Sequence, residues 1–512
     1  MNTAGSPDVR NVRQLGLVVL FAFSLVCAVL IGAGELLPVA GLVMLAGTLS
    51  LLYWGARGIE DRRGWLLAAG WCVMLFAHGA RQVSGMPVGY VLEFLEVGVV
   101  LATARCVRNI AEHDRALRVL LILLLLHFAF ALLSSLLGRS HAVAALWQLQ
   151  YNLKWPLMFG LGTLLIWNDR VEGVMRKVVG WSWIFIGLAL ALEIGLYGVH
   201  SQIFGLNLDR QPNPFLWAGG RYRGPFSHAG YFAIICALLT VGAIVQLLAG
   251  RGRAWGLVAL IYFAFVLASG QRQELLALAL ALGLLGAIRW RDHLPLLLIG
   301  IGCLVTLAIA GFIYVGYLPM QSTLAQWGLV ADLSPLSERA IISTNGIAVA
   351  QQYFPLGSGL GTYGGAGAQK FDLSLFVDLG FGRYWWFQEG LYILDTYWPC
   401  IVAESGFFGA FLVFLFFLVM WSTLFRRAWY AFETPVFGLN LLALGSLTLL
   451  LGNTPSSPIL TDPRGALVFW LIIGAAWRAS VPVRAEPKIG KAAGAPVKGI
   501  GPSPRIGVFG GR

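Results

Sequence analysis

Three arginines stand where polar loops meet apolar segments of the chain. Arg221 and Arg223 precede one apolar segment, and Arg272 lies in the short turn SGQRQE between two others. A guanidinium group presents a planar fork of donors that binds phosphate oxygens, and it stays charged at physiological pH. Three such groups converging on one cavity would bind a diphosphate. For any one of these arginines taken alone, contact with a lipid headgroup or snorkelling to the interface is the favoured explanation, and their grouping is what favours phosphate binding.

Carboxylates provide the second candidate chemistry. Asp395 and Glu404 lie at the start of a long apolar segment, where either could accept a proton as a general base. Asp395 also precedes that segment as a helix N-cap would, so both interpretations stay open. Glu93, Glu96 and Glu193 lie inside apolar segments. Such groups are costly in lipid and are candidates for function, with pairing to an arginine as the alternative.

Membrane-spanning helices must position these residues. The chain of 512 residues is 58% hydrophobic and 12% charged, which leaves too little polar surface for a water-soluble globule. A spanning helix needs about 20 mostly apolar residues. We place such segments at 14–33, 38–54, 64–79, 87–104, 118–137, 151–167, 178–197, 225–249, 255–269, 274–288, 294–317, 397–424, 435–452 and 464–478. The sequence predicts an all-α fold, a polytopic integral membrane helical bundle of about 14 (12–14) transmembrane helices with a large periplasmic loop cap.

The basic residues predict the orientation of the chain. If the N-terminus is cytoplasmic, 25 of the 36 lysines and arginines fall on the cytoplasmic side, as the positive-inside rule requires. The net charge of +12 is therefore explained by membrane topology, and we expect no nucleic-acid partner.

The loops divide the chain into four regions. They are 1–197 (N-terminal transmembrane helices), 198–424 (a core with two long outer loops), 425–478 (C-terminal transmembrane helices) and 479–512 (a disordered basic cytoplasmic tail). The outer loops are 198–224 and 318–396. The second is rich in Gly, Trp, Tyr and Phe, which indicates a folded cap with aromatic platforms for sugar rings. An interfacial aromatic belt would have the same composition.

Several enzyme classes are excluded by missing motifs. The six cysteines are scattered and predict neither a disulfide framework nor a zinc site. The sequence has no P-loop, no dinucleotide-binding fingerprint in context and no zinc-protease motif. ATPases, dinucleotide enzymes and zinc proteases are therefore not expected.

Four segments occur in an order and spacing that resemble a known family. They are RYRGPFSHAGYFAI (221–234), LASGQRQELLALALALGLL (267–285), ERAIISTNGIAVAQQYFPLGSGLGTY (338–363) and DTYWPCIVAESGFFGAFLVF (395–414). Together they resemble the O-antigen ligase and polysaccharide polymerase family of bacterial envelopes. The resemblance implies a multi-pass protein of the bacterial inner membrane whose active site faces the periplasm.

The resemblance also implies a reaction and its partners. It is a metal-independent, inverting glycosyl transfer that needs no cofactor, from an undecaprenyl diphosphate-linked oligosaccharide donor to a glycan acceptor. Arg223 and Arg272 would stabilise the diphosphate leaving group, with Arg221 and Arg339 as orienting groups. The lipid bilayer is the implied environment, and a chain-length regulator is a further partner.

One departure from the family pattern favours polymerisation. Ligases of the family carry a histidine nine residues before the Glu-x-Gly motif, where this chain has Asp395 before Glu404. The exopolysaccharide, capsule and O-antigen polymerase members, which join repeat units to one another, are more similar in this respect. The resemblance makes Asp395 the general base, with Glu404 or His228 as substitutes.

Two alternatives remain from the sequence. One is an O-antigen ligase that transfers polysaccharide to a lipid A core. The other, from a different class, is a flippase for lipid-linked oligosaccharides. Against a flippase stand the absence of pseudo-symmetric halves and the placement of the charges at one face only. A structural scaffold would not need arginines clustered beside a long cap.

Overall fold

The computed structural model describes residues 64–84, 103–104, 106–207, 212–216, 220–293, 338–432, 434–455 and 457–481. Within these residues the fold is helical throughout, with no named strand. Four helices are long and apolar enough to cross a membrane: α5 (Arg115–Leu137), α7 (Asp169–Gly195), α9 (Ala229–Leu248) and α18 (Trp398–Tyr430). An all-helical fold with membrane-type helices is thus confirmed, whereas the predicted number of about 14 spans is not.

Six further helices overlap predicted spans. They are α3 (Gly64–Ser84), α6 (Ala142–Thr163), α10 (Ala254–Ser269), α11 (Arg272–Arg289), α19 (Phe437–Asn453) and α20 (Pro463–Ala479). None of the six is both long and apolar enough to count as a candidate span by itself. The predicted spans 14–33, 38–54 and 294–317, and nearly all of 87–104, lie outside the described residues. Short helical pieces complete the bundle: α8 (Tyr197–Phe204), η2 (Arg291–His293) and η4 (Ile459–Thr461).

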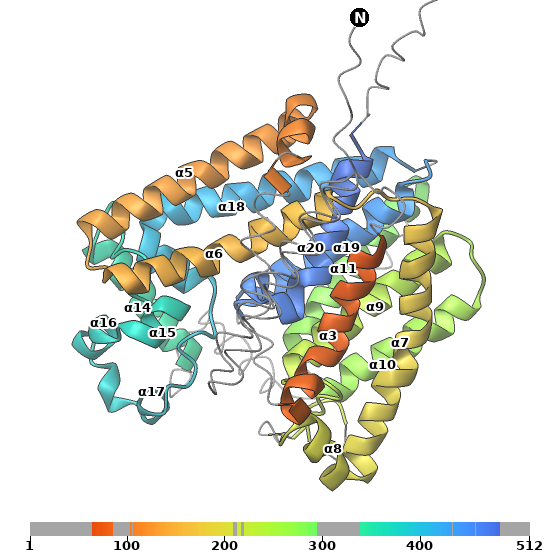
Figure 1. Ribbon diagram of the computed structural model, residues 1–512, viewed down its shortest axis with the longest axis horizontal. Coiled ribbons are helices and arrows are strands. Elements are labelled where there is room, and N and C mark those ends of the chain that lie inside the picture. Colours follow the sequence, from red (N-terminus) through yellow and green to blue (C-terminus); the bar gives the residue numbers. More distant parts are fainter. Residues whose placement is uncertain are drawn as a thin grey trace, which may run out of the picture.

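The α9 helix forms the centre of one half of the bundle. Its sequence is apolar on every side, which is typical of a helix surrounded by others. The helices α7, α10, α11 and α19 pack around it. In the other half, α5 packs along α18, and α6 packs against α20 (Figure 1).

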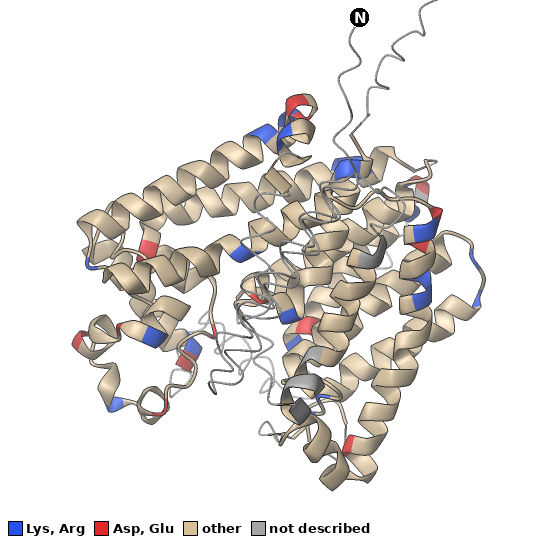
Figure 2. Ribbon diagram, in the orientation of Figure 1, with Lys and Arg blue, Asp and Glu red and all other residues tan. Residues whose placement is uncertain are grey.

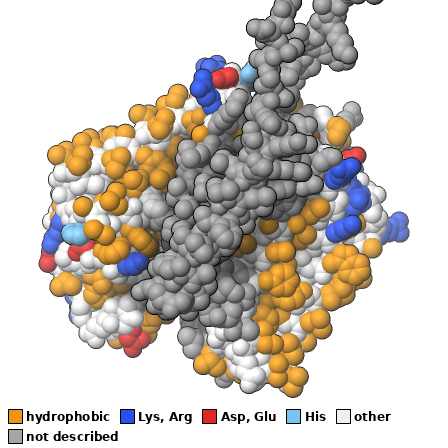
Figure 3. Space-filling model, in the orientation of Figure 1, with side chains coloured by type: hydrophobic (Ala, Val, Ile, Leu, Met, Phe, Trp, Pro, Cys, Tyr) orange, Lys and Arg blue, Asp and Glu red, His pale blue; other side chains and the backbone are white. Residues whose placement is uncertain are grey.

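The outer faces of the bundle are apolar. Large side chains such as Leu125, Leu136 and Phe411 are more than half exposed. Figure 3 shows hydrophobic side chains spread over much of the visible helix surface. Soluble monomers rarely expose apolar surface on this scale, so these faces support a membrane-embedded protein.

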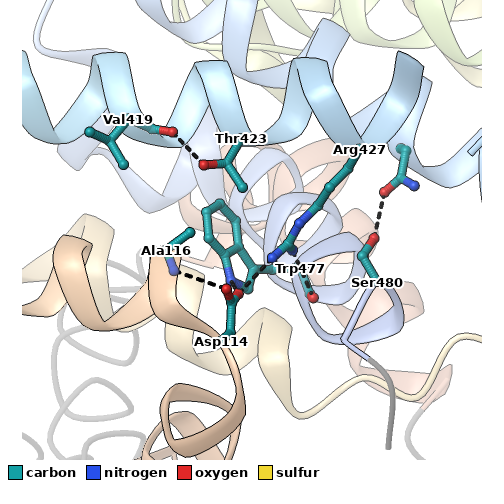
Figure 4. A network of polar contacts seen from close by, with 8 residues as sticks. Asp114, Ala116, Val419, Thr423, Arg427, Trp477 and Ser480 are labelled. Carbon is teal, nitrogen blue, oxygen red and sulfur yellow. Dashed lines mark hydrogen bonds and ion pairs between the residues drawn. The ribbon is translucent and has the colours of Figure 1, made fainter. Parts of the chain in front are cut away.

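A buried ion pair ties three helices at one end of the bundle (Figure 4). Arg427 Nη2 of α18 lies 2.6 Å from Asp114 Oδ2, which precedes α5. The same Oδ2 accepts a hydrogen bond of 2.7 Å from the indole nitrogen of Trp477 in α20. Asp114 also caps α5 by accepting from the backbone N–H of Ala116. A carboxylate with this many donors holds the ends of α5, α18 and α20 in register.

Other contacts join the ends of neighbouring helices and the loops beside them. Arg251 in the α9–α10 loop pairs with Glu172 near the start of α7, and Arg291 donates to the carbonyl of Trp429 at 2.8 Å. At the opposite ends, Arg139 Nη1 lies 2.6 Å from an oxygen of Asp378. Each contact joins segments that the sequence assigns to one side of the membrane. The agreement concerns only the relative placement of these ends, and their cytoplasmic or periplasmic assignment stays a prediction.

The described part of the second outer loop is a small folded unit. It contains α14 (Glu338–Gln352), α15 (Ala366–Phe371), α16 (Ser374–Asp378), η3 (Phe381–Arg383) and α17 (Trp385–Gln388). We call residues 338–396 the cap. Its core is aromatic, with Tyr363 stacked on Phe376 at 4.7 Å between ring centroids. Most of these rings are fully buried, so they stabilise the cap itself. These buried rings therefore offer no platform for a sugar ring, whereas Phe354, Phe371 and Trp385 of the cap are exposed, and for those three the aromatic platform stays a prediction.

Candidate functional site

The glycine-rich segment of the cap docks on a break in α18. Gly406 has φ 67°, in the left-handed region, and interrupts the helix. The carbonyl of Ala403 accepts a hydrogen bond of 2.9 Å from the backbone N–H of Ser358, and that of Glu404 accepts one of 3.0 Å from Gly359. The cap backbone thus supplies the donors that an unbroken helix would supply itself.

The side chain of Glu404 strengthens the same contact. Its Oε1 accepts hydrogen bonds from the backbone N–H groups of Thr362 at 3.1 Å and Tyr363 at 3.2 Å. Gly357 approaches so closely that an added Cβ would lie 2.4 Å from the backbone nitrogen of Gly406. The two motifs PLGSGLGTY and Glu-x-Gly therefore form one structural unit. In this position Glu404 is a buried anchor of the cap.

Asp395 forms an ion pair with Arg339. Arg339 Nη2 lies 2.9 Å from Asp395 Oδ2, and both side chains are about one-third exposed. The N-cap residue of α18 is Tyr397, and no side chain caps that helix end. Asp395 therefore does not cap the N-terminus of α18, and the capping interpretation is wrong.

Two further arginines and a second carboxylate share the surroundings of this ion pair. The guanidinium charges of Arg339 and Arg221 both act on the carboxylate of Glu274 in the first turn of α11. Arg221 lies against the turn that carries Arg272, because an added Cβ at Gly270 would lie 2.8 Å from Arg221 Cγ, and the two guanidinium groups repel each other. The structure thus brings together Arg221, Arg272 and Arg339, which the sequence predicts as diphosphate-binding and orienting residues. Mutual repulsion of cations is relieved by an anion, so this grouping favours binding of phosphate oxygens.

Glu274 is a site residue that the sequence analysis missed. It is buried, and its Oε2 has no hydrogen-bond partner among the described residues. An added Cβ at Gly230 would lie 3.5 Å from Glu274 Oε1 and 3.1 Å from His228 Nδ1, so the two side chains face the same point. His228 caps α9 by accepting from the N–H of Gly230 at 3.0 Å. The sequence signal that could have identified Glu274 is its position, two residues after Arg272 at a tight turn.

Arg223 has a different environment from the other arginines. Its Nη2 donates to the carbonyl of Phe204 at 2.9 Å and also to that of Gly205, and its side chain is buried. Burial lowers the pKa of Arg223, and the negative charge of Glu193 opposes this change. These contacts fix the end of α8 and the following loop. The diphosphate contact predicted for Arg223 stays a prediction, and the proposal below does not depend on it.

Glu193 shows how one intramembrane carboxylate is satisfied. Its Oε2 accepts from the backbone N–H groups of Arg223 at 3.0 Å and Gly224 at 2.8 Å. Its Oε1 accepts from the side-chain amide of Asn207 at 2.8 Å. Glu193 thus organises the first outer loop. Glu93 and Glu96 lie outside the described residues.

The charged side chains are unevenly distributed. Figure 2 shows few charges along the middle of α5 and α18 and more at the helix ends and in the cap. No group of three or more His, Cys, Asp or Glu side chains among the described residues could hold a metal ion. The described cysteines are all free thiols. The arginine and carboxylate group around Asp395 is a concentration of charge at the junction of cap and bundle, and Arg464 and Asp462 form a separate ion pair at the start of α20.

Comparison with known proteins adds no assignment. No protein-family model matches the chain, and no curated protein is significantly similar to it. The functional interpretation therefore depends on the residues and on their geometry.

Proposed function

We propose that the protein is a membrane glycosyltransferase of the bacterial inner membrane. It polymerises undecaprenyl diphosphate-linked saccharide repeat units at the periplasmic face, by inverting transfer without a metal. One observation carries the proposal, the Arg339–Asp395 ion pair in the neighbourhood of Arg221 and Arg272. It joins a candidate base to cations suited to a diphosphate, at the junction of the cap and the bundle.

The arginines act on the donor. As the bond between the anomeric carbon and the diphosphate oxygen breaks, its electron pair moves onto the diphosphate. Arg221 and Arg272 are fixed beforehand in the first outer loop and at the start of α11, so they stabilise this growing charge without reorganisation. The carboxylate of Glu274 balances part of the positive charge of Arg221 and Arg339.

Asp395 acts on the acceptor. Its carboxylate takes the proton of the acceptor hydroxyl as the oxygen bonds to the anomeric carbon from the face opposite the leaving group. Inversion follows because there is one displacement and no covalent intermediate on the protein. Arg339 holds the carboxylate in one orientation through the 2.9 Å contact.

The products that accumulate without the protein test the proposal. Deletion is expected to leave single lipid-linked repeat units on the periplasmic face of the inner membrane. Long lipid-linked chains would instead indicate a ligase, and repeat units trapped on the cytoplasmic face would indicate a flippase. In a reconstituted assay, purified protein in vesicles should convert lipid-linked repeat units into polymer, and failure with correctly folded protein would overturn the proposal.

A further inference from the structure

A small pocket lies directly beside Asp395. It is formed by α6, the glycine-rich segment, the first turn of α18 and the segment at η4. Its lining residues are Gln148, Tyr151, Asn152, Gly364, Gly365, Leu394, Thr396, Tyr397, Cys400, Ile401, Pro458 and Thr461. None of these residues carries a formal charge at neutral pH, so the pocket differs from the arginine group next to it. Leu394 and Thr396 flank Asp395 in the chain and connect the two sites.

A chain of hydrogen bonds fixes the orientation of two amide side chains in the pocket wall. The backbone N–H of Gly367 donates to Gln148 Oε1 at 3.0 Å. Gln148 Nε2 donates in turn to Asn152 Oδ1 at 3.0 Å. The position of each oxygen is therefore determined by its donor. As a result, the NH2 group of Asn152 is the end that is left for another partner.

Two polar atoms at the pocket have no partner within the described structure. They are Asn152 Nδ2 and Thr396 Oγ1, on side chains that are 5% and 1% exposed. Leaving a buried donor or acceptor unpaired costs about 1–3 kcal/mol, so such groups usually face a bound molecule or water. An amide NH2 donates, and a threonine hydroxyl both donates and accepts. This pair matches a single hydroxyl group of a sugar, which can both accept and donate.

We propose that this pocket receives one hydroxyl group of a neutral sugar residue of the acceptor glycan, with the sugar ring lying over the mouth of the pocket. The inference rests on the proposed function for the identity of that glycan. Asn152 donates to that hydroxyl and Thr396 exchanges a hydrogen bond with it, while Tyr151 and Tyr397 contribute aromatic surface to the wall. The next hydroxyl of the same sugar then faces Asp395. The pocket thus selects which hydroxyl is glycosylated, and with it the linkage of the polymer.

The absence of charge in the lining predicts selectivity. A uronic acid or phosphorylated sugar would bring an anion into a buried pocket whose described walls offer no cation. Burying an unpaired charge is costly. The pocket is therefore expected to take neutral sugars and to reject acidic ones.

Binding of simple glycosides tests the inference separately from activity. Purified full-length protein in nanodiscs would be mixed with methyl glucoside, galactoside, mannoside or N-acetylglucosaminide, and with methyl glucuronide as the acidic comparison. Saturation-transfer NMR should detect at least one neutral glycoside, with the glucuronide at least about tenfold weaker. Thr396→Val keeps the shape of the side chain but removes the hydroxyl, and it should weaken binding about tenfold. Thr396→Ser keeps the hydroxyl and should bind as the wild type does.

A second variant and a parallel activity assay separate the possible failures. Asn152→Leu should weaken glycoside binding as Thr396→Val does. The thermal unfolding midpoint of at least one of the two variants should equal that of the wild type. If no neutral glycoside binds, or if both variants bind like the wild type, the inference is wrong even where polymer is formed. If binding depends on Thr396 and Asn152 but lipid-linked repeat units are not polymerised, the pocket stands and the proposed function fails.

Discussion

Arg339 Nη2 lies 2.9 Å from Asp395 Oδ2, and this ion pair joins the first turn of α14 to the segment that leads into α18. The two residues are 56 positions apart in the chain. Their side chains remain about one-third exposed, so a substrate can reach the carboxylate without breaking a buried pair. This geometry at the border between cap and bundle suits the role of base that we propose for Asp395.

Asp395→Asn should abolish most polymerisation while leaving the fold intact. The amide keeps the shape of the side chain but cannot accept the acceptor proton, so the rate should fall about 100-fold or more. Polymer formed from lipid-linked repeat units in vesicles is the measurement. Asp378→Asn is the matched control, because it removes another cap carboxylate that is paired with an arginine elsewhere. Equal rates for Asp395→Asn and wild type would require a different base, with Glu274 or His228 next to test.

Arg272→Ala should reduce the rate of transfer by removing a cation from the leaving group. The expected loss of transition-state stabilisation is about 2–4 kcal/mol, and Arg272→Lys should restore only part of it. Arg383 in the cap is a suitable control, since its guanidinium lies at the exposed surface against its neighbour Tyr384. Arg383→Ala should therefore polymerise normally. Normal turnover by Arg272→Ala would remove this arginine from the site.

Arg223→Met should act mainly on stability. Its guanidinium binds the carbonyl of Phe204 and orders the end of α8, so the apolar variant leaves buried carbonyls unpaired. The thermal unfolding midpoint in detergent, followed by tryptophan fluorescence, should fall. The fraction of protein that stays folded should keep much of the wild-type turnover. A normal midpoint together with lost turnover would instead support the diphosphate contact predicted from the sequence.

Gly357→Ala should separate the cap from α18. This glycine has φ 88°, and an added Cβ would lie 2.4 Å from the backbone nitrogen of Gly406, which has no room to move. Limited proteolysis should then cut the cap faster than in the wild type. Gly382 lies in the same cap, and a Cβ added there would have nothing within 4 Å. The cap of the Gly382→Ala variant should therefore be cut at the wild-type rate. Indistinguishable digestion of the two variants would contradict the docking described here.

The sequence predicted the helices better than the site. Hydropathy locates a spanning helix because the bilayer imposes length and apolarity on one continuous segment. It also placed Arg272 at the start of α11, because the short turn before that helix leaves little choice. The inward orientation of Arg223 depends on carbonyls at the end of α8, and the docking of Glu404 depends on a distant loop. Such tertiary contacts leave no local pattern in the sequence.

The break in α18 links the biogenesis of the cap to that of the membrane helices. The carbonyls of Ala403 and Glu404 accept hydrogen bonds from the backbone N–H groups of Ser358 and Gly359. These two residues precede α18 in the chain and are therefore synthesised before it. If α18 entered lipid without those donors, the carbonyl of Ala403 would be unpaired at a cost of several kcal/mol. The carbonyl of Glu404 would keep only its hydrogen bond of 2.7 Å from the hydroxyl of Ser134 in α5. Insertion of α18 into the membrane and docking of the cap should therefore be coupled. The glycine-rich segment would have to lie at the membrane surface before α18 is inserted.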